Sequence, residues 1–284
     1  MAKASVTKVK KFLVSPTKLR TFYQCPAKYR LEYIERLGRF FHRARPGFSL
    51  GHSLHRVLDT FHNAGGAQNV SAQSLAASLD SAWVASGYEN PAEETAFRDQ
   101  AVEMLHAYHA AQEQALASLA DDPAAPPPPI LLWTEKTLRI DLSPEIALSG
   151  RIDRVDEHAD GALEIVDYKS GRDTVTVEDV AGSLALSIYQ LLVKHVMADR
   201  RVFATLVALR TGASASSEMS GSALEELAAA CLETAETLRG KDWENVLPVV
   251  NEHCPYCDFL PHCTRHWRQE ARREGRAAPE ILPL

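Results

Sequence analysis

Apolar residues recur at helical spacing through much of the first 120 residues. Leu54, Val57, Leu58 and Phe61 stand at i, i+3, i+4 and i+7, which predicts an amphipathic helix over 51–63. Ser15 followed by a proline predicts another helix start, because serine caps free amides and proline fits the first turn. That helix is expected to reach Cys25. Further helices are expected around 29–34 and over 71–88 and 91–119.

The pattern changes after residues 121–129, where four consecutive prolines predict an extended linker. Three short stretches rich in β-branched residues then follow, separated by turn-prone residues, and predict an antiparallel meander. We expect these strands at 130–141, 147–156 and 162–169, then a helix at 178–198, a strand at 202–210 and a helix at 222–240. The order indicates a mixed α/β fold with a helical insertion.

The sequence predicts one domain over 1–284. We divide it into a helical part and insertion (12–120), the linker (121–129), a core (130–240), and a cysteine cluster with a basic tail (250–284). With 45% hydrophobic and 24% charged residues, the chain has the composition of an ordinary globular protein. This composition excludes a disordered or collagen-like chain.

The formal net charge of -6 hides an uneven distribution. Residues 1–45 carry twelve Lys and Arg against two Asp and Glu, residues 46–263 carry 14 against 32, and residues 264–284 carry five against three. A basic segment can bind a polyanion even where the whole chain is acidic. Nucleic acid therefore stays a candidate ligand.

A cytoplasmic location and no membrane association are predicted. The chain holds no run of 18 apolar residues, which a transmembrane helix requires. Its basic first residues lack the apolar stretch of a secretory signal. Five cysteines, an odd number, fit a reducing compartment better than a disulfide framework.

Two acids and a lysine are expected at one end of the meander. Asp167 and Lys169 lie two apart on the third strand and share a face, where Asp153 of the second strand can meet them. Such carboxylates bind Mg²⁺ or Mn²⁺, which can polarise a phosphate and activate water. The alternative is that the acids form surface ion pairs with Arg151, Arg154 or Lys169. The apolar strand that leads into Asp167 favours the site.

Three cysteines crowd into ten residues, namely Cys254, Cys257 and Cys263. This spacing indicates a metal centre whose fourth ligand lies elsewhere in the chain. Cys25, which like Cys254 precedes a proline, is the candidate. Zinc is an alternative metal, with three histidines available as ligands: His253, His262 and His266. Cys231 lies on a helical face rich in Ala and Leu and is assigned to core packing.

The ordered set of motifs resembles the RecB-like branch of the PD-(D/E)XK nuclease superfamily. Within that branch it is similar to the iron-sulfur members related to the AddB nuclease domain and to the CRISPR-associated four-cysteine exonucleases. The resemblance runs from about residue 12 to 264 through segments 15–19, 25–26, 51–55, 150–153, 166–171 and 189–191 and the clustered cysteines. It implies a restriction-endonuclease-like αβββαβ core with a mixed sheet and an iron-sulfur clip that joins the terminal segments.

The resemblance also implies site residues. The catalytic Mg²⁺ or Mn²⁺ would be held by His55, Asp153, Asp167 and the backbone carbonyl of Tyr168. Two further catalytic side chains would be Lys169 and Gln190. A 4Fe-4S cluster would be held by Cys25, Cys254, Cys257 and Cys263. Glu135, on the first strand, is a candidate for the outer shell of the metal and not for the ligand set.

These implications make a DNA exonuclease, acting on single-stranded ends in repair, recombination or CRISPR-type processing, the leading hypothesis. Charge and stacking would bring the strand to basic and aromatic residues, namely Lys18, Arg20, Tyr23, Tyr29, Arg30 and Tyr189. No GxxxxGK[ST] phosphate loop is present, so a helicase would act in trans. The alternatives are a non-catalytic DNA-binding or assembly subunit, and a zinc-stabilised hydrolase of another phosphate ester.

Overall fold

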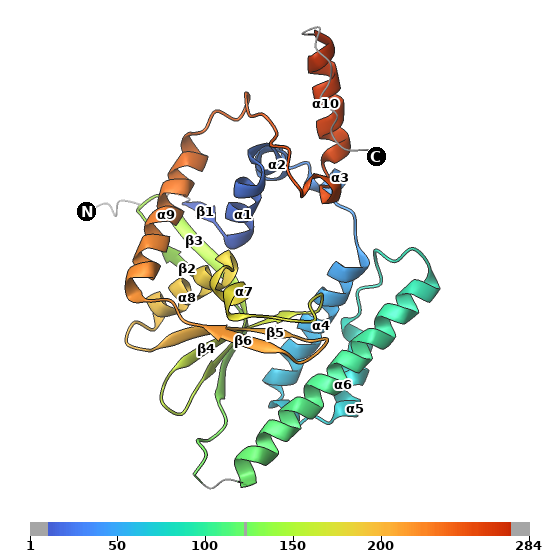
Figure 1. The fold of residues 1–284 in the computed structure, drawn as a ribbon, viewed down its shortest axis with the longest axis vertical. Helices are drawn as coiled ribbons and strands as arrows, with labels where there is room; N and C mark the ends of the chain where they lie inside the picture. Colours follow the sequence, from blue (N-terminus) through green and yellow to red (C-terminus); the bar gives the residue numbers. More distant parts are fainter. Residues whose placement is uncertain (1–10, 122–123, 274–284) are drawn as a thin grey trace, which may run out of the picture. The chain divides into compact units, whose positions relative to one another are not determined.

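The computed structural model describes residues 11–121 and 124–273 (Figure 1). The first half is helical, with one short strand: β1 (Phe12–Val14), α1 (Pro16–Gln24), α2 (Pro26–Tyr29), a π-helix (Arg30–Ile34), α3 (Gly38–Phe41), α4 (Pro46–Asn63), a 3₁₀ turn (Gly66–Gln68), α5 (Ala72–Ala82) and α6 (Pro91–Asp121). The second half holds β2 (Ile130–Asp141), β3 (Ile146–Glu157), β4 (Leu163–Lys169), α7 (Val177–Ala181), α8 (Leu184–Val196), β5 (Val202–Ala208), β6 (Ser214–Ser217), α9 (Gly221–Gly240), a 3₁₀ turn (Cys254–Tyr256) and α10 (Leu260–Arg273).

A mixed sheet of six strands forms the core. Its order is β1-β3-β4-β5-β6, and β2 pairs with β3 off this path. Strands β2, β3 and β4 form the predicted antiparallel meander, and β5 lies parallel to β4 after the crossover through α7 and α8. The αβββαβ order is therefore confirmed.

Helix α4 buries an apolar stripe. Leu54, Val57, Leu58 and Phe61, the residues that predict this helix, are at most 2% exposed. They belong to one core cluster with residues of α5, α6 and β4, namely Leu75, Leu79, Ala101, Met104, Leu105, Val166 and Tyr168. Figure 1 shows α4, α5 and α6 beside one another. The helical insertion therefore braces α4 against the sheet.

Helix α8 packs closely on β3 because β3 holds a glycine there. A Cβ atom at Gly150 would lie 2.8 Å from Cε1 of Tyr189 and 3.0 Å from a methyl group of Leu192. Real Cβ atoms do not approach that closely, so a larger residue would push the helix away. Gly150 thus fixes the distance between α8 and the strand that carries Asp153.

The chain divides into two compact units. The first holds residues 1–13 and 44–232, and the second holds residues 14–43 and 233–284. The second unit is therefore built from two segments that lie far apart in the sequence. The whole meander and α4 belong to the first unit.

The structure confirms most predicted elements and corrects several boundaries. Helix α4 begins at Pro46 and not at 51, since glycines at 47 and 51 hide its first turns. The helix expected over 71–88 ends at Ala82, and Gly87, at φ 92°, passes so close to Arg45 that a Cβ would meet its backbone nitrogen at 2.6 Å. The helix expected over 178–198 is two helices, because Ser183 caps a new one.

Two short strands were not predicted. Strand β1 has three residues, and β6 is a run of serine and alanine without β-branched residues. The strand expected over 202–210 ends at Ala208, where the chain turns into β6 through Gly212 at φ 74°. Among the described residues, no helix combines the length and the apolarity needed to cross a bilayer.

Candidate metal centre

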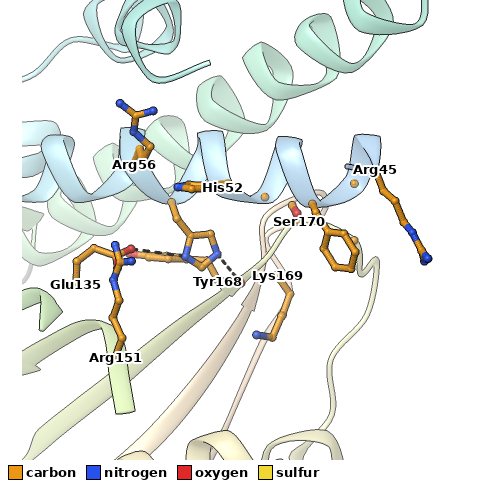
Figure 2. A pocket seen from close by; sticks show the side chains of 13 residues that line it. Arg45, His52, Arg56, Glu135, Arg151, Tyr168, Lys169 and Ser170 are labelled. Atoms are coloured by element: carbon orange, nitrogen blue, oxygen red, sulfur yellow. Dashed lines mark hydrogen bonds and ion pairs between the residues drawn. The ribbon is translucent and has the colours of Figure 1, made fainter. Parts of the chain in front are cut away.

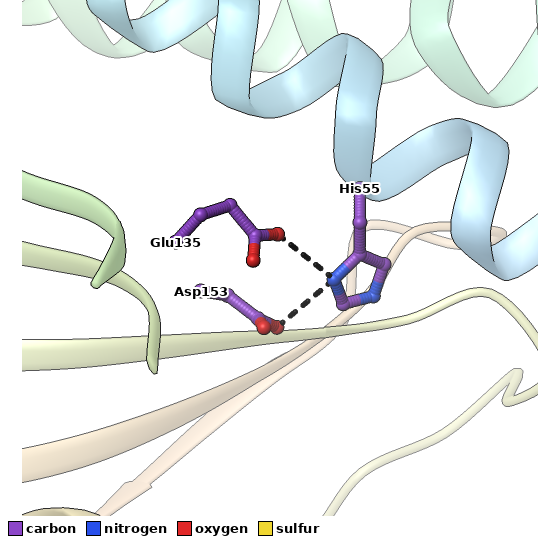
Figure 3. Close-up of side chains that lie close together, drawn as sticks. All are labelled: His55, Glu135 and Asp153. Atoms are coloured by element: carbon purple, nitrogen blue, oxygen red, sulfur yellow. Dashed lines mark ion pairs between the residues drawn. The ribbon is translucent and has the colours of Figure 1, made fainter. Parts of the chain in front are cut away.

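Three side chains from three elements meet at one point (Figure 3). His55 of α4, Glu135 of β2 and Asp153 of β3 place ligand atoms within 4.8 Å of one another, the one such group among the described residues. The Nδ1 atom of His55 lies 3.3 Å from Oδ2 of Asp153 and 3.8 Å from Oε1 of Glu135. One imidazole with two carboxylates is a donor set that suits a divalent cation.

The strands open where these side chains meet. Direct pairing of β3 with β4 runs from Glu157 opposite Leu163 to Arg154 opposite Val166. Two residues beyond Val166, the backbone N–H of Tyr168 donates to Oδ2 of Asp153 at 3.1 Å. The carbonyl of Tyr168 accepts from Nε2 of His55 at 3.2 Å. Because the β3–β4 ladder ends here, the N–H and carbonyl groups of Tyr168 form hydrogen bonds with the Asp153 and His55 side chains.

Glu135 reaches the group through an unusual backbone conformation. Its φ is 46°, in the left-handed region that non-glycine residues seldom adopt, although it lies inside β2. Its carboxylate also forms an ion pair with Arg151. The local strain is held by the surrounding sheet, and it accompanies a side chain that points at His55 and Asp153.

Asp167 and Lys169 form an ion pair on β4. Asp153 and Asp167 adjoin Arg154 and Val166, the last pair of the ladder between β3 and β4, and the Asp153 charge acts on Asp167. Asp167 is 5% exposed, and its Oδ2 is the oxygen that the Lys169 ammonium contacts. It does not belong to the group within 4.8 Å that includes Asp153. Burial and the Asp153 carboxylate raise the pKa of Asp167, and Lys169 opposes them.

The electrostatics of the group fit a bound cation. Burial alone would lower the pKa of His55, but its contacts with Asp153 and Glu135 outweigh burial and raise this pKa to about 10. A cation at the carboxylates would replace that proton and relieve the repulsion between Asp153 and Asp167. The donor set of His55, Glu135 and Asp153 therefore suits a divalent metal such as the one that the sequence predicts.

A cavity of about 790 Å³ opens onto this group (Figure 2). Its walls come from α4, from the strands and from the turn after β4. Positively charged side chains dominate the lining, namely Arg45, Arg56, Arg151 and Lys169, while Glu135 is the acid among the lining residues. Such a lining attracts an anionic ligand toward the candidate metal centre.

A buried hydrogen-bond network lies behind the cavity. The Arg154 guanidinium donates to Nε2 of His62 at 2.8 Å, to the Tyr108 hydroxyl at 2.8 Å and to the Tyr168 hydroxyl at 2.7 Å. It also pairs with Asp156 at 2.9 Å. His62 lies two turns after His55 on α4. The network thus connects α4, α6, β3 and β4 next to the candidate metal centre.

The remaining predicted catalytic residue lies apart from this cavity. Gln190 is 2% exposed, and its Oε1 accepts from the backbone N–H of Met219 at 3.0 Å. It does not line the cavity. Tyr189, a predicted DNA contact, lies against Gly150. Both side chains support the sheet where the structure places them.

The other predicted DNA contacts lie in the second unit. Arg20 and Tyr23 are exposed, and Lys18 is half-buried with its amine 5.7 Å from the Tyr33 ring centre. Tyr29 is 1% exposed and stacks on Trp243 at a centroid distance of 5.1 Å. Arg30 donates to the Trp243 and Glu244 carbonyls and pairs with Glu35. Tyr29 and Arg30 thus serve internal packing, a role that their sequence context did not indicate.

The second unit also brings four cysteines together. A second cavity is lined by Cys25, Cys254, Cys257 and Cys263. Burial, together with the three other thiols, raises the pKa of Cys263 to about 11. No three of these thiols lie within 4.8 Å of one another. Cys231 is 1% exposed inside α9, as predicted from its helical face, and the side chain of His266 lies outside the described residues.

A mixed αβββαβ core with a carboxylate and imidazole group beside an Asp-X-Lys pair defines the class of metal-dependent nucleases. A family model described as the PD-(D/E)XK nuclease superfamily matches residues 13–264, and the chain belongs to this superfamily. Membership indicates a metal-dependent nuclease that binds DNA. No curated protein matches the chain.

Glu135 is the residue that the sequence undervalued. From the sequence, Glu135 is predicted only for the outer shell of the metal. Its carboxylate nevertheless belongs, like that of Asp153, to the group of ligand atoms that lie within 4.8 Å of one another. An acid in an apolar strand was the available signal. The left-handed φ that aims it at His55 has no signature in the sequence, because glutamate rarely adopts that conformation.

Proposed function

We propose that this protein is a RecB-like, metal-dependent exonuclease that degrades single-stranded DNA ends with Mg²⁺ or Mn²⁺. One observation carries the proposal: His55, Glu135 and Asp153 converge next to the Asp167–Lys169 pair, beside a cavity whose lining includes His55, Glu135 and cationic side chains. A duplex end binds poorly to a pocket of this kind, because its bases and both backbones must enter together. An unpaired strand needs room for one backbone.

Each residue has a distinct proposed role. The cation would be held by His55, Asp153, Asp167 and the Tyr168 carbonyl, with Glu135 as an added acidic group. A divalent cation there would polarise a phosphodiester oxygen and lower the pKa of water. The Lys169 ammonium orients the attacking water and stabilises charge that develops on the phosphate. Gln190 supports this site by fixing the chain after β6.

The strand is also proposed to contact surface residues of the second unit. Lys18, Arg20 and Tyr23 offer charge and an exposed ring, which suits sequence-independent binding of single strands. A helicase of another chain would supply unpaired ends. The five cysteines support a reducing, cytoplasmic setting, where repair, recombination or CRISPR-type processing takes place.

The alternative is a DNA-binding or assembly subunit that keeps the fold without the reaction. It would bind strands tightly and show no metal-dependent cleavage. The joint presence of Asp153, Asp167 and Lys169 favours the enzyme, because a subunit without catalysis has no need for all three.

Digestion of end-labelled DNA tests the proposal directly. Single-stranded and blunt double-stranded substrates are incubated with Mg²⁺, Mn²⁺ or EDTA. Wild-type protein should shorten the single strand in a metal-dependent way. Asp167→Ala and Lys169→Ala should each lower the rate by about 10²- to 10³-fold or more, because a charged group that stabilises the transition state is lost.

Matched variants separate chemistry from folding. Asp199→Ala and Lys136→Ala remove an exposed acid and an exposed lysine that do not line the cavity, and both should retain activity. Circular dichroism and urea unfolding check that all four variants fold. Undiminished cleavage in folded Asp167→Ala and Lys169→Ala would overturn the assignment. Tight strand binding without cleavage by the wild type would support the alternative.

We further propose that the four cysteines of the second unit hold a 4Fe-4S cluster. Support comes from the one cavity that all four cysteines line and from the close spacing of Cys254, Cys257 and Cys263 in the sequence. Burial raises the pKa of the Cys257 and Cys263 thiols and favours their protonated form, so positive iron would have to stabilise the thiolates.

A further inference from the structure

A phenylalanine stands exposed on the wall of the metal-centre cavity. Phe48 is 73% exposed and lines the cavity, although it belongs to the first turns of α4. Single exposed apolar residues are common and need no function. The position of this ring relative to the site is what gives it meaning.

Phe48 lies on the same face of α4 as His55. Positions 48, 51, 52 and 55 stand at i, i+3, i+4 and i+7, and all four line the cavity. Seven residues of helix put the ring about 10 Å along the axis from His55. That distance places the ring beside a nucleotide that neighbours the cleaved phosphate, and not beside the phosphate itself.

The same end of the cavity offers positive charge and little bulk. Arg45 precedes α4 and lines the cavity, and Figure 2 shows its side chain at the start of the helix. Gly51 has no side chain, and a Cβ there would come within 3.2 Å of Oγ of Ser170. Ser170 follows β4 directly, so the turn after Lys169 runs close to the helix. A thin, flexible, anionic ligand suits this space.

We infer that Phe48 is a specificity-determining residue: its ring stacks on the unpaired base next to the cleaved phosphodiester, and Arg45 holds the backbone at that position. This inference rests on the proposed nuclease function and names what selects its substrate. A base can stack on a protein ring only where it has left its partner strand. Phe48 therefore distinguishes single strands from duplexes.

Binding measurements test the ring apart from catalysis. The affinity for a labelled single-stranded oligonucleotide is measured by fluorescence anisotropy in Ca²⁺, and KM and kcat are measured in Mg²⁺ or Mn²⁺. Phe48→Ala should raise Kd and KM about tenfold or more, since stacking of one base is lost. The value of kcat should stay within about twofold. Phe48→Trp should keep or improve both constants.

Two controls isolate base stacking. An oligomer of the same length with abasic sites throughout keeps the phosphates, so Phe48→Ala should bind it as the wild type does. Phe40→Ala removes another exposed phenylalanine, 67% exposed and outside the cavity lining, and should change nothing.

The inference fails if Phe48→Ala leaves the affinity for the base-bearing strand unchanged, or weakens both strands equally. Absence of cleavage by the wild type would overturn the nuclease function alone, because the Ca²⁺ binding comparison still reports on stacking. The two failures are thus distinguishable.

Discussion

The carboxylate of Glu135 shows how one residue can complete a site. Three ligand atoms from three different elements can bind a cation only if their side chains are held in place. The ion pair with Arg151 holds the Glu135 carboxylate. A strained φ at a functional position is maintained by the structure around it. Glu135 is therefore expected to act on metal affinity more than on folding.

Glu135→Gln should weaken metal binding about 10- to 100-fold, because it removes a negative charge while keeping the side-chain shape. The measurement is the Mn²⁺ concentration that gives half-maximal cleavage, with isothermal titration of Mn²⁺ alongside. Cleavage at saturating metal should largely recover. Glu225→Gln, a change of an exposed acid on α9, is the matched control. An unchanged metal requirement would place Glu135 outside the metal's surroundings.

Helix α4 is the element on which the site depends most. It carries His55 toward the carboxylates, and seven residues later His62 accepts from Arg154 in the buried network. Burial, with the Arg154 charge, lowers the pKa of His62 to about 2 in the folded protein. In the unfolded chain this pKa returns to about 6.5.

This difference predicts a loss of stability in acid. Below pH 6.5 the unfolded chain binds a proton at His62 that the folded protein does not, so unfolding becomes more favourable as pH falls toward 2. The contribution reaches about 2 kcal/mol between pH 6.5 and 5. His62→Gln keeps an acceptor for Arg154 and removes the proton site, so its free energy of unfolding should vary less with pH.

Urea unfolding at pH 7, 6 and 5 measures this effect. Other groups titrate in both proteins, so the difference between wild type and His62→Gln isolates the one histidine. His106→Gln changes an exposed histidine of α6 and should follow the wild type. Parallel pH curves for wild type and His62→Gln would show that His62 does not stay neutral in the folded protein.

The sequence pattern predicted most helices and strands but not the contacts between them. Period-2 and helical spacing located the meander and α4, because each of them buries one regular face. The start of α4 and the break before α8 were missed, since glycine and serine signals are ambiguous there. Contacts such as Arg154 with His62 join residues 92 apart, and no local pattern encodes them. Likewise Tyr29 was predicted to contact DNA, whereas it is 1% exposed and stacks on Trp243.

At the scale of the whole molecule, the second unit consists of two segments that lie far apart in the chain, residues 14–43 and 233–284. A cluster bound to Cys25 of the first segment and to three cysteines of the second would cross-link them. Closing so long a loop removes much entropy from the unfolded chain. The unit is thus expected to depend on its metal for stability.

Anaerobically purified protein should absorb near 400 nm and contain iron and sulfide. Cys25→Ser should lose this absorbance and unfold at a lower temperature, since it leaves the cluster one ligand short. Cys231→Ala changes a buried cysteine outside the group and should keep the absorbance. One zinc ion per chain without iron would overturn the cluster proposal and leave the nuclease proposal intact.

The wide separation of these cysteines also imposes an order on biosynthesis. Cys263 is made 238 residues after Cys25, the difference between their positions in the chain. At about 5–20 residues per second, Cys25 emerges about 12–48 s before its last partner exists. To bind the proposed cluster, its thiol would have to stay reduced and free of other metals during that interval. Insertion of the proposed cluster would therefore be a late event, which follows synthesis of the sheet.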